Sequence, residues 1–137
     1  MKNLFIEDND EICINLFVGT YKDGTIFCEK NEEMLLKSMS GLVDPVDCMI
    51  ESYEIKFKKP SFGDSINLYG VIFGDKSSSF NPVAARFNIM VELAKEWNLT
   101  DNKEFVKPTE EQIKKLHPVI ASFIGIQLDA EIGGSLN

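Results

Sequence analysis

The alternation of apolar and polar residues predicts three strands before Pro60. Residues 12–18 and 25–29 are rich in β-forming side chains, and the turn Lys22-Asp23-Gly24 between them favours a β-hairpin. Residues 48–59 alternate apolar with charged side chains, which is typical of a strand with one face in water. The lysines of this strand form either a binding stripe or a solvated face or protected edge, and we favour the second interpretation.

Helical spacing of apolar residues dominates the rest of the chain. The clearest stripe is Phe87, Met90, Ala94 and Trp97, and it predicts a helix that begins after the cap Asn81 and ends at Trp97. Two further helices are predicted on either side of the third strand. One covers residues 32–39 and is capped by Asn31, and the other covers residues 62–73, follows a capping box of Ser61 and Asp64, and is expected to bury Ile66, Tyr69 and Phe73.

Two more helices are predicted near the C-terminus. A short one follows the capping box Thr109–Gln112 and runs up to Leu116, and the last one runs from Pro118 to about Ile132 and is ended by Gly133-Gly134.

Together these elements predict an α+β fold. We expect an N-terminal β-hairpin or small antiparallel sheet packed with a C-terminal bundle of about four helices. A length of 137 residues fits one domain, with a β-rich half at residues 1–59 and a helical half at residues 60–137. A chain of this length buries a core without needing disulfides or metal ions.

The charge balance narrows the class of partner. The formal net charge is −8, which disfavours non-specific binding to nucleic acid and docking on an anionic membrane surface. No apolar run approaches the ~20 residues of a membrane-spanning helix, and the N-terminus does not resemble a secretory signal. The sequence therefore predicts a cytoplasmic protein without a membrane or nucleic-acid partner.

Few residues carry candidate chemistry. Cys13, Cys28 and Cys48 lie in apolar runs without metal-ligand spacing, so we expect them to be buried and free, as in a reducing compartment. His117 precedes a proline, and no nucleophile motif accompanies it. An enzyme or small-ligand binder would need a pocket at His117 or a pair among the many carboxylates. We expect a non-enzymatic protein with no catalytic residue, metal or cofactor.

The last predicted helix is more apolar than a surface helix normally is. Its additional apolar face is either packed in the core or offered to a partner, and the sequence leaves both open. The candidate partner-binding residues on this helix are Ile120, Phe123, Ile124, Ile126 and Leu128.

Four features between about residues 53 and 132 carry a family resemblance. They are the strand-to-proline entry at residues 57–61, the segment Glu96-Trp97-Asn98-Leu99-Thr100-Asp101 at a helix end, the connector at residues 106–111, and a helix containing Leu116 that leads into the apolar last helix. In this order they resemble small tail assembly chaperones of bacteriophages and prophages. Residues 1–47 lie outside this resemblance.

The resemblance implies a function in virion assembly. A protein of this kind would bind hydrophobic surface of the tape measure protein in the host cytoplasm and keep it soluble until tube subunits polymerise around it. The alternative is a structural subunit of the tail, baseplate or connector, whose β-rich half joins neighbouring subunits through sheet edges. Whether the chain forms a homo-oligomer is left open by the sequence.

Overall fold

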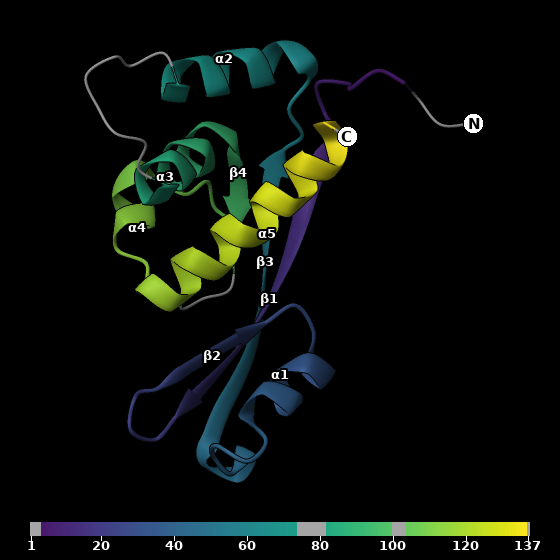
Figure 1. Cartoon of the computed structure of the whole chain (residues 1–137). Helices are drawn as coiled ribbons and strands as arrows, with labels where there is room; N and C mark the ends of the chain where they lie inside the picture. The colour runs from purple at the N-terminus through teal and green to yellow at the C-terminus, as the bar shows by residue number, and fades with distance from the viewer. Residues whose placement is uncertain (1–3, 74–81, 100–103, 137) are drawn as a thin grey trace.

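Two long antiparallel strands form the spine of the molecule. The computed structural model describes residues 4–73, 82–99 and 104–136. Strands β1 (Glu11–Tyr21) and β3 (Cys48–Lys58) pair along their whole length, and the short strands β2 (Ile26–Glu29) and β4 (Ala94–Trp97) flank them in the order β2-β1-β3-β4 (Figure 1). The predicted α+β fold is confirmed.

The predicted N-terminal hairpin is also confirmed. Gly24 has a φ of +94°, a conformation that favours glycine, and the backbone N–H of Thr25 donates to the carboxylate of Asp23 at 2.9 Å. Helix α1 (Glu32–Met39) follows, and the side chain of Asn31 accepts the backbone N–H of Met34 at 2.8 Å. These local signals are sufficient because each bond joins residues two or three positions apart.

One face of the sheet carries the main core. In β1, Ile12, Ile14 and Leu16 are buried, whereas the intervening residues are exposed. Ile14 is paired with the buried Ile55 of β3. Helix α5 (Pro118–Leu136) packs on this face and adds Ile124, as well as Leu128 and Ile132, to the same core (Figure 1).

At the other end of the ribbon, α1 packs on the opposite face. A Cβ at Gly19 would lie 2.8 Å from the sulfur of Met39, and Ser38 Oγ donates to the Glu29 carboxylate at 2.7 Å. Leu35 and Met39 are fully buried, forming a small cluster against Gly19. We call β2, α1, the 3₁₀ turn Pro45–Asp47 and the adjoining parts of β1 and β3 the hairpin end, and the remainder the helical end.

Three more helices build the helical end together with α5. They are α2 (Phe62–Phe73), α3 (Pro82–Leu93) and α4 (Glu110–Lys114). Both predicted capping boxes are confirmed: Ser61 and Asp64 exchange backbone and side-chain hydrogen bonds at the start of α2, and Thr109 and Gln112 do so at the start of α4. The expected cap Asn81 lies outside the described residues.

The predicted helix end at Trp97 is wrong. Helix α3 ends at Leu93, and Ala94–Trp97 is the edge strand β4. Trp97 is opposite Ile55, and its backbone N–H and C=O bond with Val106 at 2.9 and 2.8 Å. Pairing with β3 and burial of the indole outweigh the weak local preference for helix. The helical half of the chain therefore supplies one strand of the sheet.

Helix α5 also differs from its predicted end, because it continues through Gly133-Gly134 to Leu136. Each glycine costs a helix only about 1 kcal/mol relative to alanine, and the buried Ile132 anchors the last turns. Within the described residues, no helix combines the length and the apolar character needed to cross a bilayer.

Two predicted burial positions are wrong as well. Ile66 of α2 is 55% exposed, and Cys13 is exposed because it alternates with the core positions of β1. The side chains of Tyr69 and Phe73 lie outside the part of the chain whose burial the structure describes. The stripe expected on α3 is shifted: Met90 is buried, whereas Phe87 is only partly buried.

Candidate functional site

His117 lies in the exposed link between α4 and α5. Its Nδ1 accepts the backbone N–H of Val119 at 3.2 Å, which fixes the entry into α5. Among residues 4–73, 82–99 and 104–136, no three His, Cys, Asp or Glu side chains gather closely enough to hold a metal ion. The histidine therefore has a local structural contact, and the structure gives it no metal-site neighbours in the described chain.

The three cysteines are free thiols with raised pKa values. Burial raises the pKa of Cys28 to about 11. Partial burial and the nearby carboxylates of Glu54 and Glu11 raise the pKa of Cys13, and burial with Asp47 raises that of Cys48. A thiol whose pKa lies above its usual value stays protonated at neutral pH, which disfavours nucleophilic use.

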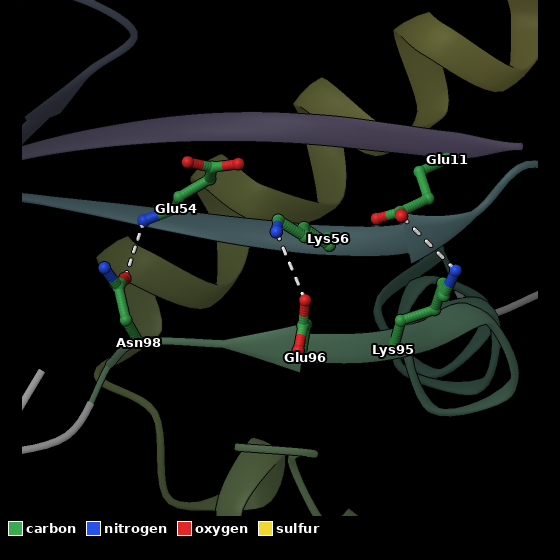
Figure 2. Close-up of polar contacts among 6 residues, drawn as sticks. All are labelled: Glu11, Glu54, Lys56, Lys95, Glu96 and Asn98. Atoms are coloured by element: carbon green, nitrogen blue, oxygen red, sulfur yellow. Dashed lines mark hydrogen bonds and ion pairs between the residues drawn. The ribbon is translucent and has the colours of Figure 1, made fainter. Parts of the chain in front are cut away.

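The outer face of the sheet at the helical end is polar. Figure 2 shows Lys56 of β3 bonded to Glu96 of β4 at 3.2 Å and Glu11 of β1 paired with Lys95 at 3.5 Å. The side chain of Asn98 accepts the backbone N–H of Glu54 at 2.7 Å. Helix α5 lies behind the sheet in this view.

The lysines of β3 are thus matched by acids. The hydrogen bond with Glu96 raises the pKa of Lys56, and Lys58 pairs with Asp64 at 3.4 Å. Lys56 also lies over the ring of Phe105, with 4.5 Å from Nζ to the ring centre. Because the positive charges are compensated, this face does not form a basic stripe, and the interpretation as a solvated face agrees with the geometry.

An apolar groove between α3, α4 and α5 is the clearest candidate binding site. Its volume is about 450 Å³, within the range of ligand and peptide pockets. We call it the α3–α5 groove. Apolar side chains from all three helices and from the link between α4 and α5 line it: Val83, Phe87, Met90, Ile113, Leu116, Pro118 and Ala121. Met90 and Ile113 are buried and form its floor, being 4% and 5% exposed.

Local sequence features hold the three walls apart. The capping box of Thr109 starts α4, and Pro118 starts α5 at a position where proline needs no hydrogen-bond donor. Gly125 permits close packing of α3 on α5, because an added Cβ there would lie 3.1 Å from Cδ of Arg86. The groove is therefore a consequence of how the helices start and pack, and it is preformed.

Charged groups occupy the rim of the groove. Arg86 Nε donates to Asp129 at 3.1 Å, and Lys114 pairs with Glu110 at 3.5 Å while lying 5.6 Å from the ring centre of Phe87. All four charged side chains are at least one-third exposed. Such pairs contribute little to stability, so they can exchange partners when an occupant binds.

The five candidate residues on the last helix do not share one surface. Ile124 and Leu128 are 0% and 1% exposed and belong to the core. Ile120 and Phe123 are partly buried against the same core, whereas Ile126 is 49% exposed and lies on the solvent side. Of the two interpretations left open by the sequence, core packing therefore holds for most of this apolar face.

The groove residues were missed because they come from α3, α4 and the first turns of α5, which no local pattern in the sequence joins, and because those on α5 are not its most apolar residues. Ala121 and Ser122 are small, and so is Gly125 one turn later. A run of small residues on one side of an otherwise bulky helix indicates the close approach of another helix. This was the available signal in the sequence, although it could not show that the approach leaves a groove.

Comparisons with protein-family models, curated proteins and solved structures found no match to this chain.

Proposed function

We propose that this chain is a non-enzymatic assembly protein of a bacteriophage tail, which binds an apolar segment of the tape measure protein during construction of the tail tube. The observation that carries the proposal is the α3–α5 groove, a preformed apolar site with a charged rim. A long helical partner with exposed apolar residues needs such a site to stay soluble in the host cytoplasm.

The shape of the groove favours a helical occupant. Its walls are helices, and its apolar floor is bordered by exposed charged side chains, the arrangement in which an amphipathic helix inserts apolar residues at i, i+3 or i+4, and i+7. Arg86 and Lys114 at the rim are paired with Asp129 and Glu110, so the rim offers exposed charges of both signs to the flank of that helix. We therefore expect the bound tape measure segment to be amphipathic, with charged residues beside its apolar stripe.

The position of the groove in the sequence supports the same partner. Every lining residue falls between 83 and 122, inside the region of about residues 53–132 that resembles tail assembly chaperones. Because Ile124 and Leu128 are core residues, the binding surface in this proposal is the groove and not the face of five residues considered above.

A structural subunit of the tail, baseplate or connector is a second candidate function. The observation that favours it is the part of β3 that extends beyond β4, where the described chain provides no neighbouring strand at the sheet edge. The two functions predict different locations, because an assembly chaperone leaves before the particle is complete, whereas a structural subunit is present in purified particles.

The test is capture of partners from the native cells during particle production. Tagged wild-type protein should recover the tape measure protein, as identified by mass spectrometry, and the chain should be absent from finished particles. A Ser122→Trp variant, which places an indole at the exposed wall of the groove, should lower this recovery by about tenfold or more.

The matched control is Ala130→Trp, which places the same side chain at another exposed position of α5 outside the groove lining. It should capture the partner as the wild type does. Equal capture by both variants would contradict the groove as the site. Recovery of tube or baseplate subunits, with the chain present in particles, would favour the structural subunit, and recovery of neither class would contradict a tail function.

A further inference from the structure

The outer edge of β3 at the hairpin end is the second feature that calls for a partner. β4 pairs with β3 only from Ile55 to Phe57, and Asn98 continues the contact to Glu54. At the N-terminal end of β3, the 3₁₀ turn ends at Cys48, whose backbone N–H donates to the C=O of Pro45. Residues 49–53 are therefore paired with β1 on one side and have no strand on the other in the described chain.

This edge has little of the usual protection against pairing, since Glu51 is its one charged residue. Natural edges carry lysine, proline or a bulge, whereas the open segment is Met-Ile-Glu-Ser-Tyr, and the irregularity in β3 lies farther along, at Lys56/Phe57. Apolar side chains with high exposure lie in this segment and just before it in the sequence: Met49 is 66% exposed, Val46 88% and Leu42 72%. A weakly protected edge beside exposed apolar residues is typical of a strand that pairs with another chain.

The hydrogen-bonding groups on this edge can be assigned from the register. The N–H and C=O of Glu54 both point toward Asn98, on the β4 side. Since backbone groups alternate along a strand, Ser52 and Ile50 point the same way, while Met49, Glu51 and Tyr53 point toward β1. Ile50 and Ser52 are therefore the residues that a new neighbour would bond.

We propose that this edge pairs with the same edge of a second copy of the chain, antiparallel and across a two-fold axis at Ile50. In this arrangement Ile50 is opposite Ile50 of the second copy, and Ser52 is opposite Cys48, whose C=O accepts the N–H of Ser52 while its own N–H stays bonded to Pro45. The two sheets join into one continuous sheet, and the second copy partly buries the exposed side chains of Ile50 and Met49. The proposal does not rest on the proposed function, since it uses no residue of the α3–α5 groove.

The charges select this register over its alternatives. An axis at Glu51 would place two Glu51 carboxylates directly opposite each other, and an axis at Met49 would place Asp47 opposite Glu51. An axis at Ser52 would require both the N–H and the C=O of Glu54, which already bond Asn98, whereas the axis at Ile50 gives up only the N–H of Cys48. With the axis at Ile50, Glu51 is opposite Met49 and no like charges face each other.

Self-complementarity is the reason to name a second copy as the occupant. Ile50 of each copy supplies a donor and an acceptor to Ile50 of the other, the N–H of Ser52 donates to the C=O of Cys48, and each copy covers Ile50 and Met49 of the other. The segment contributes only one charge per copy, Glu51, although the whole chain carries −8. Salt screens the general repulsion between two copies with this net charge, so we expect the dimer to be favoured at higher ionic strength.

The test compares oligomeric state for three forms of the full chain by light scattering after size exclusion. Wild type should have twice the chain mass of 15.5 kDa, with a concentration-dependent dissociation. Ile50→Lys and Ile50→Glu should each lower the association constant by about tenfold or more, because each places like charges opposite one another. An equimolar mixture of the two variants should restore the dimer, because residue 50 then meets the opposite charge.

A disulfide provides a second readout that does not depend on stability. Ser52→Cys places a thiol opposite Cys48 of the other copy, and within one chain these positions are too far apart along the strand to bond. Oxidation should yield a covalent dimer, and Ser52→Cys combined with Cys48→Ser should not. A wild type that stays at 15.5 kDa up to about 1 mM, a dimer unaffected by either charge, or no cross-link would overturn the proposal.

Discussion

The two ends of the molecule use the same sheet in opposite ways. At the helical end, α5 covers one face, and β1, β3, α3 and α5 share one continuous core that includes Ile124. At the hairpin end, only α1 covers the other face, with Leu35 and Met39 as its buried residues. Apolar side chains of the 3₁₀ turn and of β3, such as Val46 and Met49, are exposed at this end.

The two ends differ in how much apolar surface they bury and in where a partner could bind. The helical end buries a large core that extends over several elements, and it has a shaped opening, the α3–α5 groove. The hairpin end has a small buried cluster of Leu35 and Met39, and no strand of the described chain covers its sheet edge. We therefore expect the helical end to respond to mutations in its core with loss of the fold, and the hairpin end to respond mainly in its local packing and its association.

The largest effect is expected in the main core of the helical end. Ile124→Ala removes a fully buried side chain and should lower the free energy of unfolding by about 2–5 kcal/mol, as measured by urea denaturation. Ile126→Ala, two residues along the same helix, removes a side chain that is 49% exposed and should change it by less than about 0.5 kcal/mol. Similar losses from both would contradict the orientation of α5.

A smaller effect is expected at the hairpin end. Gly19→Ala introduces a Cβ that would lie 2.8 Å from the sulfur of Met39, so α1 must shift, at a cost of about 1–3 kcal/mol. Hydrogen exchange should show loss of protection in α1 but not in α5. An unchanged α1 in Gly19→Ala would contradict its packing on that face.

Gly133→Ala is the matched control in α5. An added Cβ there meets no atom of another segment within 4 Å, so the substitution should stabilise α5 by up to about 1 kcal/mol.

The smallest effect is a pH dependence at the junction of β3 and α2. The backbone N–H of Ser61 and the neighbouring Lys58 hold the pKa of Asp64 below its ordinary value of 3.8. Because the folded-state pKa is lower than the unfolded one, the stabilisation is complete above pH 3.8 and is lost as the pH falls below it.

Asp64→Asn should therefore be less stable than the wild type at neutral pH and approach it in acid, as followed by urea denaturation at a series of pH values. The difference should be modest, because the carboxylate is partly exposed to water. A difference that stays constant into acid would show that Asp64 does not act through its charge.

The elements with local signals could be predicted from the sequence. The Asp23-Gly24 turn, the cap at Asn31 and the box at Thr109 each depend on residues within three positions, and all are present. The conversion of Ala94–Trp97 into a strand could not be predicted, since it depends on β3 and on Val106, which are distant in sequence. Helical spacing through Trp97 carried no information about that pairing.

The candidate site was predicted less well than the fold. The apolar character of the last helix was correctly noted, but hydrophobicity alone does not separate a core residue such as Leu128 from an exposed one such as Ile126. Periodicity also cannot show an opening between three helices, because a groove depends on where small residues such as Ala121 meet another helix. The open edge of β3 likewise depends on how far β4 extends along it.

The most direct test of the central claim is site-specific photocrosslinking in cells that produce particles. A photoreactive side chain at Ser122, in the wall of the groove, should form a covalent bond to the tape measure protein, and one at Ala130 should not. Mass spectrometry of the cross-linked product identifies the bound segment, which we expect to be an amphipathic helix with charged residues beside its apolar stripe. Cross-links from position 130 but not 122, or none to any tail protein, would contradict binding of the tape measure protein in the α3–α5 groove.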